Sequence, residues 1–266
     1  MTKQGKTIQP VVKPILTGNW HGRDAVKLGL KLMLSVLLVS FLYLLLSLLL
    51  SFDSLIIRIG SALLLVVAAY AYLYYTGMSV GAGDAAFGEI MFVRQSEGKE
   101  VPVADRDRCY HPAKGFFAAL IGVLPFVLIA LCYAVVAKPS AYVLGSLPSW
   151  LSGYTRQSGI GDALAYYSQR DGLGLYTVLK VVVRSMTMPF INVAVKLGTD
   201  ATLWAERLAP LWVMVAPLGY GFGYRQGLKQ RTQIHTGIAI GDRRKKKRAN
   251  KERKARQRSQ APERLI

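Results

Sequence analysis

The sequence predicts an all-α, polytopic integral membrane protein with four transmembrane helices and one further amphipathic or re-entrant helix. Three observations support this fold class: long apolar runs without charge, lysine and arginine gathered at both chain ends, and a hydrophobic fraction of 52% with a mean hydropathy of +0.28. A hydrocarbon core about 30 Å thick is crossed by roughly 20 apolar residues in a helix. A protein with five spans is the alternative.

Three apolar runs are long enough to cross a bilayer. Leu32 to Phe52 contains 21 uncharged residues, Ile59 to Gly83 contains 25, and Gly115 to Ala137 contains 23. We expect the first three spans at about 32–52, 59–80 and 115–137. Pro125 lies in the third span, where we expect a kink and no break, because neighbouring groups in a helix bundle satisfy the carbonyl that proline frees.

The final third of the chain contains two candidate segments. Residues 173–197 are apolar on average but include Lys180 and Arg184, and a cation near the bilayer centre costs a few kcal/mol. The second segment runs from about 203 to 224. If both segments cross, there are five spans and the C-terminus lies outside. If only the second crosses, residues 173–197 lie along the outer surface or dip into the bilayer without crossing.

The charge distribution predicts the orientation. Residues 1–31 carry six basic residues and one acidic residue, and residues 225–266 carry fifteen basic and three acidic residues. Lysine and arginine next to spans stay on the cytoplasmic side, which favours four spans with both termini in the cytoplasm of a bacterial cell. We therefore expect a basic N-terminal segment (1–31), a transmembrane domain (32–224) with an outer segment (138–202), and a polybasic tail (225–266).

The polybasic tail is the strongest candidate for a functional site. Its cations attract phosphates, so we expect contacts with anionic lipids, with RNA or the ribosome, or with an acidic protein. The alternative is that the row of cations serves only to fix the orientation of the chain in the membrane. Like charges repel, so the tail is predicted to be disordered or only partly helical. The contact residues are Arg243, Arg244, Lys245, Lys246, Lys247, Arg248, Lys251, Arg253 and Lys254.

Two further patterns lie within or beside the predicted spans. Pairs of glycines four residues apart let membrane helices approach closely, which predicts helix packing at Gly77, Gly81, Gly219 and Gly223. Ionisable residues at membrane depth are functional candidates. These are Lys180, Arg184, Glu206 and Arg207, which either pair at the outer interface or line a path for an anionic solute.

The sequence contains no catalytic, metal-binding or nucleotide-binding motif, and its two cysteines, Cys109 and Cys132, have neither disulfide nor zinc spacing. We therefore expect a protein without cofactor that is not an enzyme. The leading interpretation is a membrane scaffold or accessory subunit whose tail binds a cytoplasmic polyanion. The alternative is a small permease or transporter subunit for an anionic solute, which would require a homo-oligomer or other membrane subunits.

Overall fold

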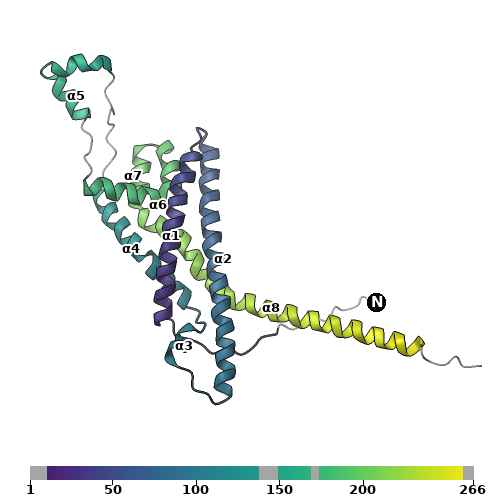
Figure 1. Cartoon of the computed structure of the whole chain (residues 1–266). Helices are drawn as coiled ribbons and strands as arrows, with labels where there is room; N and C mark the ends of the chain where they lie inside the picture. The colour runs from purple at the N-terminus through teal and green to yellow at the C-terminus, as the bar shows by residue number, and fades with distance from the viewer. Residues whose placement is uncertain (1–10, 138–148, 169–173, 260–266) are drawn as a thin grey trace, which may run out of the picture. The chain divides into compact units, whose positions relative to one another are not determined.

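The computed structural model describes residues 11–137, 149–168 and 174–259, and every element in these ranges is helical. The all-α prediction is therefore confirmed. The helices that are long and apolar enough to cross a membrane are α1 (Arg23–Leu49), α2 (Leu55–Ser96), α4 (Lys114–Val136) and α6 (Leu175–Leu197). By helix length and hydropathy, the chain is a multi-pass protein of the lipid bilayer (Figure 1).

The other described helices are shorter or more polar. They are α3 (Val103–Arg108), a 3-10 helix η1 (Ser149–Arg156), α5 (Ile160–Ser168), α7 (Thr199–Arg207) and α8 (Ala209–Ser259).

The helices form two compact units, and each unit combines distant parts of the chain. Among the described residues, unit 1 contains 11–25, 74–115 and 221–259, and unit 2 contains 26–73, 116–137, 149–168 and 174–220. The apolar core of unit 2 is built from α1, α2, α4, α6 and α8, with buried members such as Val36, Leu73, Ala130, Val183 and Val213. Unit 1 has a smaller buried cluster of Ala85, Tyr110 and Tyr224.

In unit 2, α1 and α2 form a hairpin around the turn at residues 50–54. Leu38, Leu42 and Leu46 of α1 and Leu65 and Tyr72 of α2 contribute to the lining of an apolar cavity of about 290 Å³. The two helices are therefore antiparallel neighbours. They correspond to the predicted first and second spans.

α2 continues well beyond the predicted end of the second span near residue 80. Its 42 residues extend about 63 Å at 1.5 Å per residue, roughly twice the thickness of a hydrocarbon core. No proline interrupts the helix, which ends in a Schellman motif. There Gly98 takes a φ of 77° and donates to the Gln95 carbonyl, while Lys99 donates to the Arg94 carbonyl.

α4 packs closely against α1 in unit 2. A Cβ at Gly122 would lie 2.8 Å from the Gly29 carbonyl oxygen, and a Cβ at Gly29 would lie 2.8 Å from the Ile121 side chain. Gly122 also faces Leu32, so residues later in α4 meet residues later in α1, and the two helices run in the same direction. Pro125 lies inside α4, which continues without interruption to Val136.

Both ends of α6 contact the same side of unit 2. Near its start, the Tyr176 ring lies 5.8 Å from that of Tyr133 in the last turn of α4. Near its end, Asn192 donates to the Ser47 carbonyl at 3.0 Å, close to the end of α1. Because α1 and α4 run in the same direction, their C-terminal ends lie toward one side, and α6 begins and ends there with Pro189 between.

The predicted span at 203–224 is divided between α7 and α8, with a turn at Leu208. In unit 2, a Cβ at Gly219 would lie 2.7 Å from the Tyr70 carbonyl oxygen of α2. In unit 1, Gly223 meets the Tyr74 backbone and Gly227 meets the backbone of α2 at residues 78–82. α8 therefore runs in the same direction as α2 and close to it. Four candidate spans are shown, and the identity of the fourth, α6 or α8, stays a prediction.

Candidate functional site

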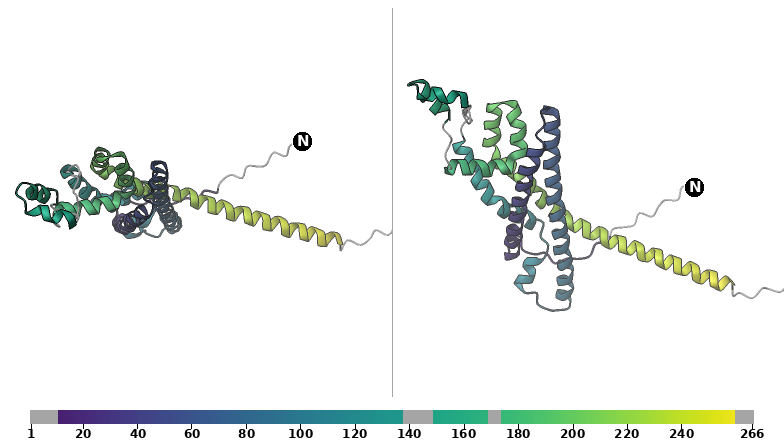
Figure 2. Two further views of the ribbon diagram at one scale, coloured as in Figure 1. Left: turned by 90° about the horizontal axis from the view of Figure 1, so that it is seen from above. Right: turned by 45° about the horizontal axis from the view of Figure 1, so that its top comes forward.

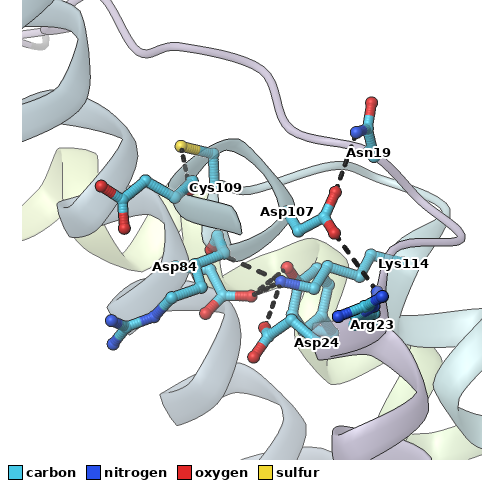
Figure 3. A network of polar contacts seen from close by, with 10 residues as sticks. Asn19, Arg23, Asp24, Asp84, Asp107, Cys109 and Lys114 are labelled. Carbon is cyan, nitrogen blue, oxygen red and sulfur yellow. Dashed lines mark hydrogen bonds and ion pairs between the residues drawn. The ribbon is translucent and has the colours of Figure 1, made fainter. Parts of the chain in front are cut away.

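α8 enters unit 1 at Gly221, and we call its part from there to Asp242 the base of α8. A buried lysine lies beside this base. The Lys114 side chain is fully buried at the start of α4, and its Nζ lies 2.8 Å from the carboxylates of Asp24 in α1 and Asp84 in α2 (Figure 3). It also donates to the Arg108 carbonyl at 3.4 Å. A buried ammonium is stable only when its charge is paired and its protons are accepted, so this lysine joins α1, α2 and α4.

Tyr224 connects α8 to this cluster. Its hydroxyl donates to Asp84 at 2.6 Å, and its ring stacks on Tyr110 with the centroids 5.4 Å apart. Tyr110 in turn donates to the Arg225 carbonyl at 3.1 Å. Burial raises the pKa of the Tyr110 hydroxyl, so it remains a donor at neutral pH. Burial likewise raises the pKa of the neighbouring Cys109 thiol, which reduces its thiolate fraction.

A second polar contact lies further along α8. Glu89 of α2 accepts two hydrogen bonds from Arg231, from Nε at 3.2 Å and from Nη2 at 3.1 Å. The Nε2 atom of His235 lies 2.7 Å from the same carboxylate. Both partners come from α8 and are separated by one helical turn, so this single carboxylate fixes α8 against α2. Charge-assisted, two-point contacts of this kind are stronger than ordinary hydrogen bonds.

The N-terminal strap, residues 11–22, is extended and crosses the same region of unit 1. The Leu16 amide donates to the Gly88 carbonyl at 3.1 Å, and the Gly18 amide donates to the Tyr110 carbonyl at 3.0 Å. The Val11 amide donates to the Thr236 hydroxyl of α8 at 3.0 Å. A side chain at position 18 would collide with the backbone of the 106–109 segment, so the strap needs glycine there.

Beyond this base, α8 carries the basic arm, which we define as residues 243–258. α8 is one continuous helix through the arm to Ser259 in every view (Figures 1 and 2), so the prediction of a disordered or partly helical tail was wrong for these residues. The packed turns before the arm supply the helix nucleus. Side chains from Arg243 to Arg253 are exposed, and none forms an ion pair with another described residue.

The charged residues predicted at membrane depth are brought together only in part. Arg184 donates from Nε to the Glu206 carboxylate at 2.6 Å, and Tyr133 donates to the other oxygen of that carboxylate at 2.9 Å. Lys180 instead lies 5.9 Å from the centre of the Tyr176 ring. Arg207 similarly approaches the Trp204 ring at 5.9 Å.

Sequence reasoning missed the residues that hold α8. None of Asp84, Glu89 and Lys114 is among the candidate site residues that the sequence predicts. The signal that the sequence does contain is a pair of acidic residues, Asp84 directly before the apolar stretch 85–93 and Glu89 within it, since a carboxylate in an apolar helix needs a partner. Which cation pairs with each carboxylate depends on which helices lie next to one another, and no local sequence pattern predicts that.

Comparison with protein-family models, with curated proteins and with solved structures finds no match for this chain.

Proposed function

We propose that this protein is an integral membrane scaffold or accessory subunit whose basic arm binds a polyanion in the cytoplasm. The observation that carries the proposal is the arm itself. Eight cations between Arg243 and Arg253 are exposed and unpaired with other described residues, on the helix whose base is fixed by Glu89 and the Lys114 cluster. Unpaired exposed cations at this density attract phosphates strongly.

The helix directions support a cytoplasmic arm. α8 runs with α2, whereas α6 starts and ends on one side of unit 2. This favours α8 as the fourth crossing, with α6 as the re-entrant helix. Four crossings put the N-terminal segment and the arm on the same side of the membrane. Both are strongly basic, and the positive-inside rule assigns that side to the cytoplasm.

The charges and the cavity of unit 2 do not favour the alternative of a permease for an anionic solute. Glu206 is 1% exposed and balances the charge of Arg184. A cavity of about 470 Å³ in unit 2 is lined by apolar side chains and tryptophan, including Phe190, Trp204 and Trp212. Such a lining gives an anion no compensation for the loss of its hydration.

The proposal is tested with the full chain in nanodiscs of neutral phosphatidylcholine. Binding is measured to a nucleic-acid duplex and to vesicles containing phosphatidylserine, over a range of salt concentrations. One variant replaces Lys245, Lys246 and Lys247 by Gln. Its matched control replaces three exposed lysines of the N-terminal half, Lys13, Lys27 and Lys31, by Gln.

We expect salt-sensitive binding to at least one probe, weakened in the arm variant and retained in the control, because only the arm concentrates positive charge on one helix. Equal weakening in both variants, or no binding of the wild-type chain to either probe, would contradict the proposal.

A further inference from the structure

We propose that the partner of the basic arm is a nucleic-acid double helix, bound through the phosphates on both walls of a groove. This inference rests on the proposed function and narrows its polyanion to one class. RNA and DNA duplexes both present phosphates along their grooves, but the wide major groove that admits a helix belongs to the B-form DNA duplex. The evidence is the placement of the cations around α8, the size of the helix, and the kinds of residue between the cations.

The cations of the arm surround the helix. At about 100° per residue, the eight basic residues from Arg243 to Arg253 leave no gap wider than about 80° around the helix axis. One group, Arg243, Lys247 and Lys251, follows one face. A second group, Lys245, Lys246 and Arg253, lies toward the opposite face. A ligand that uses the whole arm must therefore present anions on more than one side.

A planar membrane surface meets only one side of such a helix. A helix with its side chains is about 10–12 Å across, whereas the Debye length at physiological salt is about 8 Å. Cations on the far side therefore lie more than one Debye length further from the headgroups and contribute little. The major groove of a B-form duplex is about 12 Å wide and has phosphates along both walls. A helix with cations on all sides matches that environment.

The residues between the cations favour the same partner. Between Arg243 and Arg253 the other residues are Ala249, Asn250 and Glu252, so this part of the arm has no apolar face. Helices that bind a membrane surface bury such a face among the headgroups. The same stretch has no aromatic ring on which single-stranded bases could stack. A duplex contacted through its phosphates requires neither feature, and the binding is independent of base sequence.

Two triple variants of the full chain in neutral nanodiscs test the inference. Each removes three positive charges: Arg243→Gln, Lys247→Gln and Lys251→Gln on one face, and Lys245→Gln, Lys246→Gln and Arg253→Gln on the other. The probes are an RNA duplex and a DNA duplex of equal length and sequence, and vesicles of phosphatidylcholine with phosphatidylserine. Circular dichroism checks that glutamine, a good helix former, preserves the helix content.

We expect both triple variants to lose affinity for a duplex to a similar extent, by roughly 100- to 200-fold at about 150 mM salt. This is the counterion contribution of three phosphate contacts, and the slope of log K against log salt should become shallower by roughly 2–3. Comparison of the two duplexes shows which of them the arm prefers. The control lacking Lys13, Lys27 and Lys31 should bind like the wild type.

The other outcomes overturn the inference in distinguishable ways. Vesicle binding that depends on one face alone, without duplex binding, would show a membrane partner and leave the proposed function intact. Duplex binding that is unchanged in both triple variants would show that nucleic acid binds elsewhere on the chain. Binding to neither duplex nor vesicles would remove this inference and the proposed function together.

Discussion

The close contact between α8 and α2 predicts opposite effects for two alanine substitutions in one helix. Gly223 faces the Tyr74 backbone, and a Cβ there would collide with the carbonyl oxygen and lie 2.7 Å from the carbonyl carbon. Gly237, in the same helix, has no atom within 4 Å of the position that its Cβ would take, apart from its own neighbours and the backbone of its own helix. Both residues have helical backbones, so the substitutions differ mainly in the space available.

Gly223→Ala should destabilise the protein. The added methyl group meets backbone, which cannot rotate away, and overpacking of this kind costs about 1–3 kcal/mol. Gly237→Ala should stabilise α8 by up to about 1 kcal/mol, because alanine favours helix over glycine. For a chain of this size, a loss of about 2 kcal/mol corresponds to a fall in Tm of roughly 4–8 °C.

The assay is thermal unfolding of both variants and the wild type in the same detergent, followed by circular dichroism. A Tm for Gly223→Ala equal to or above that of Gly237→Ala would refute the close approach of α8 and α2. It would also remove the basis for the common direction of these helices, from which we infer that α8 is the fourth crossing.

Three further predictions concern unit 1 and the topology. Lys114→Met leaves two carboxylates without their cation and should destabilise unit 1 by about 3–5 kcal/mol. Cys109 is buried, and its raised pKa leaves little thiolate at neutral pH, so it should react slowly with maleimide in the folded protein. In a chain whose other cysteine is alanine, rapid labelling of Cys109 is therefore expected only in the Lys114→Met variant, where unit 1 is destabilised. Lys27→Met, at an exposed site in α1, should preserve the protection of Cys109, and equal labelling in both variants would contradict the prediction. Glu89→Gln weakens the contacts of α2 with α8, so hydrogen exchange at α8 amides near residues 231–236 should become faster. Unchanged exchange would show that the Glu89 carboxylate does not hold α8 against α2. An Asp200→Cys chain, on an otherwise cysteine-free background, should react with an impermeant reagent on intact cells, whereas reaction only after permeabilisation would make α6 the fourth crossing.

The sequence predicted the membrane class well because bilayer thickness is a strong constraint on helix length. The run at 59–80 lies within α2, the run at 32–52 lies within α1 apart from its last three residues, and the run at 115–137 lies within α4 apart from its last residue. α8 is harder to recognise because Pro210, Pro217 and several glycines reduce its hydropathy, although these glycines allow its close contact with α2.

The polar cluster of unit 1 could not be predicted from local sequence. Asp24, Asp84 and Lys114 are far apart along the chain, and their pairing depends on three helices meeting in one place. The helical arm was missed for a different reason. Repulsion among its cations is a local property, whereas the turns of α8 that nucleate the helix are stabilised by Tyr224 and Arg231 through contacts with α2.

We propose that the basic arm lies in the cytoplasm after an even number of crossings. This proposal is tested most directly by an Asn250→Cys chain that lacks the two natural cysteines, with a Ser158→Cys chain as the control for the outer segment. An impermeant maleimide should label position 158 on intact cells and position 250 only after the membrane is permeabilised. Labelling of position 250 on intact cells would put the arm outside and contradict the account.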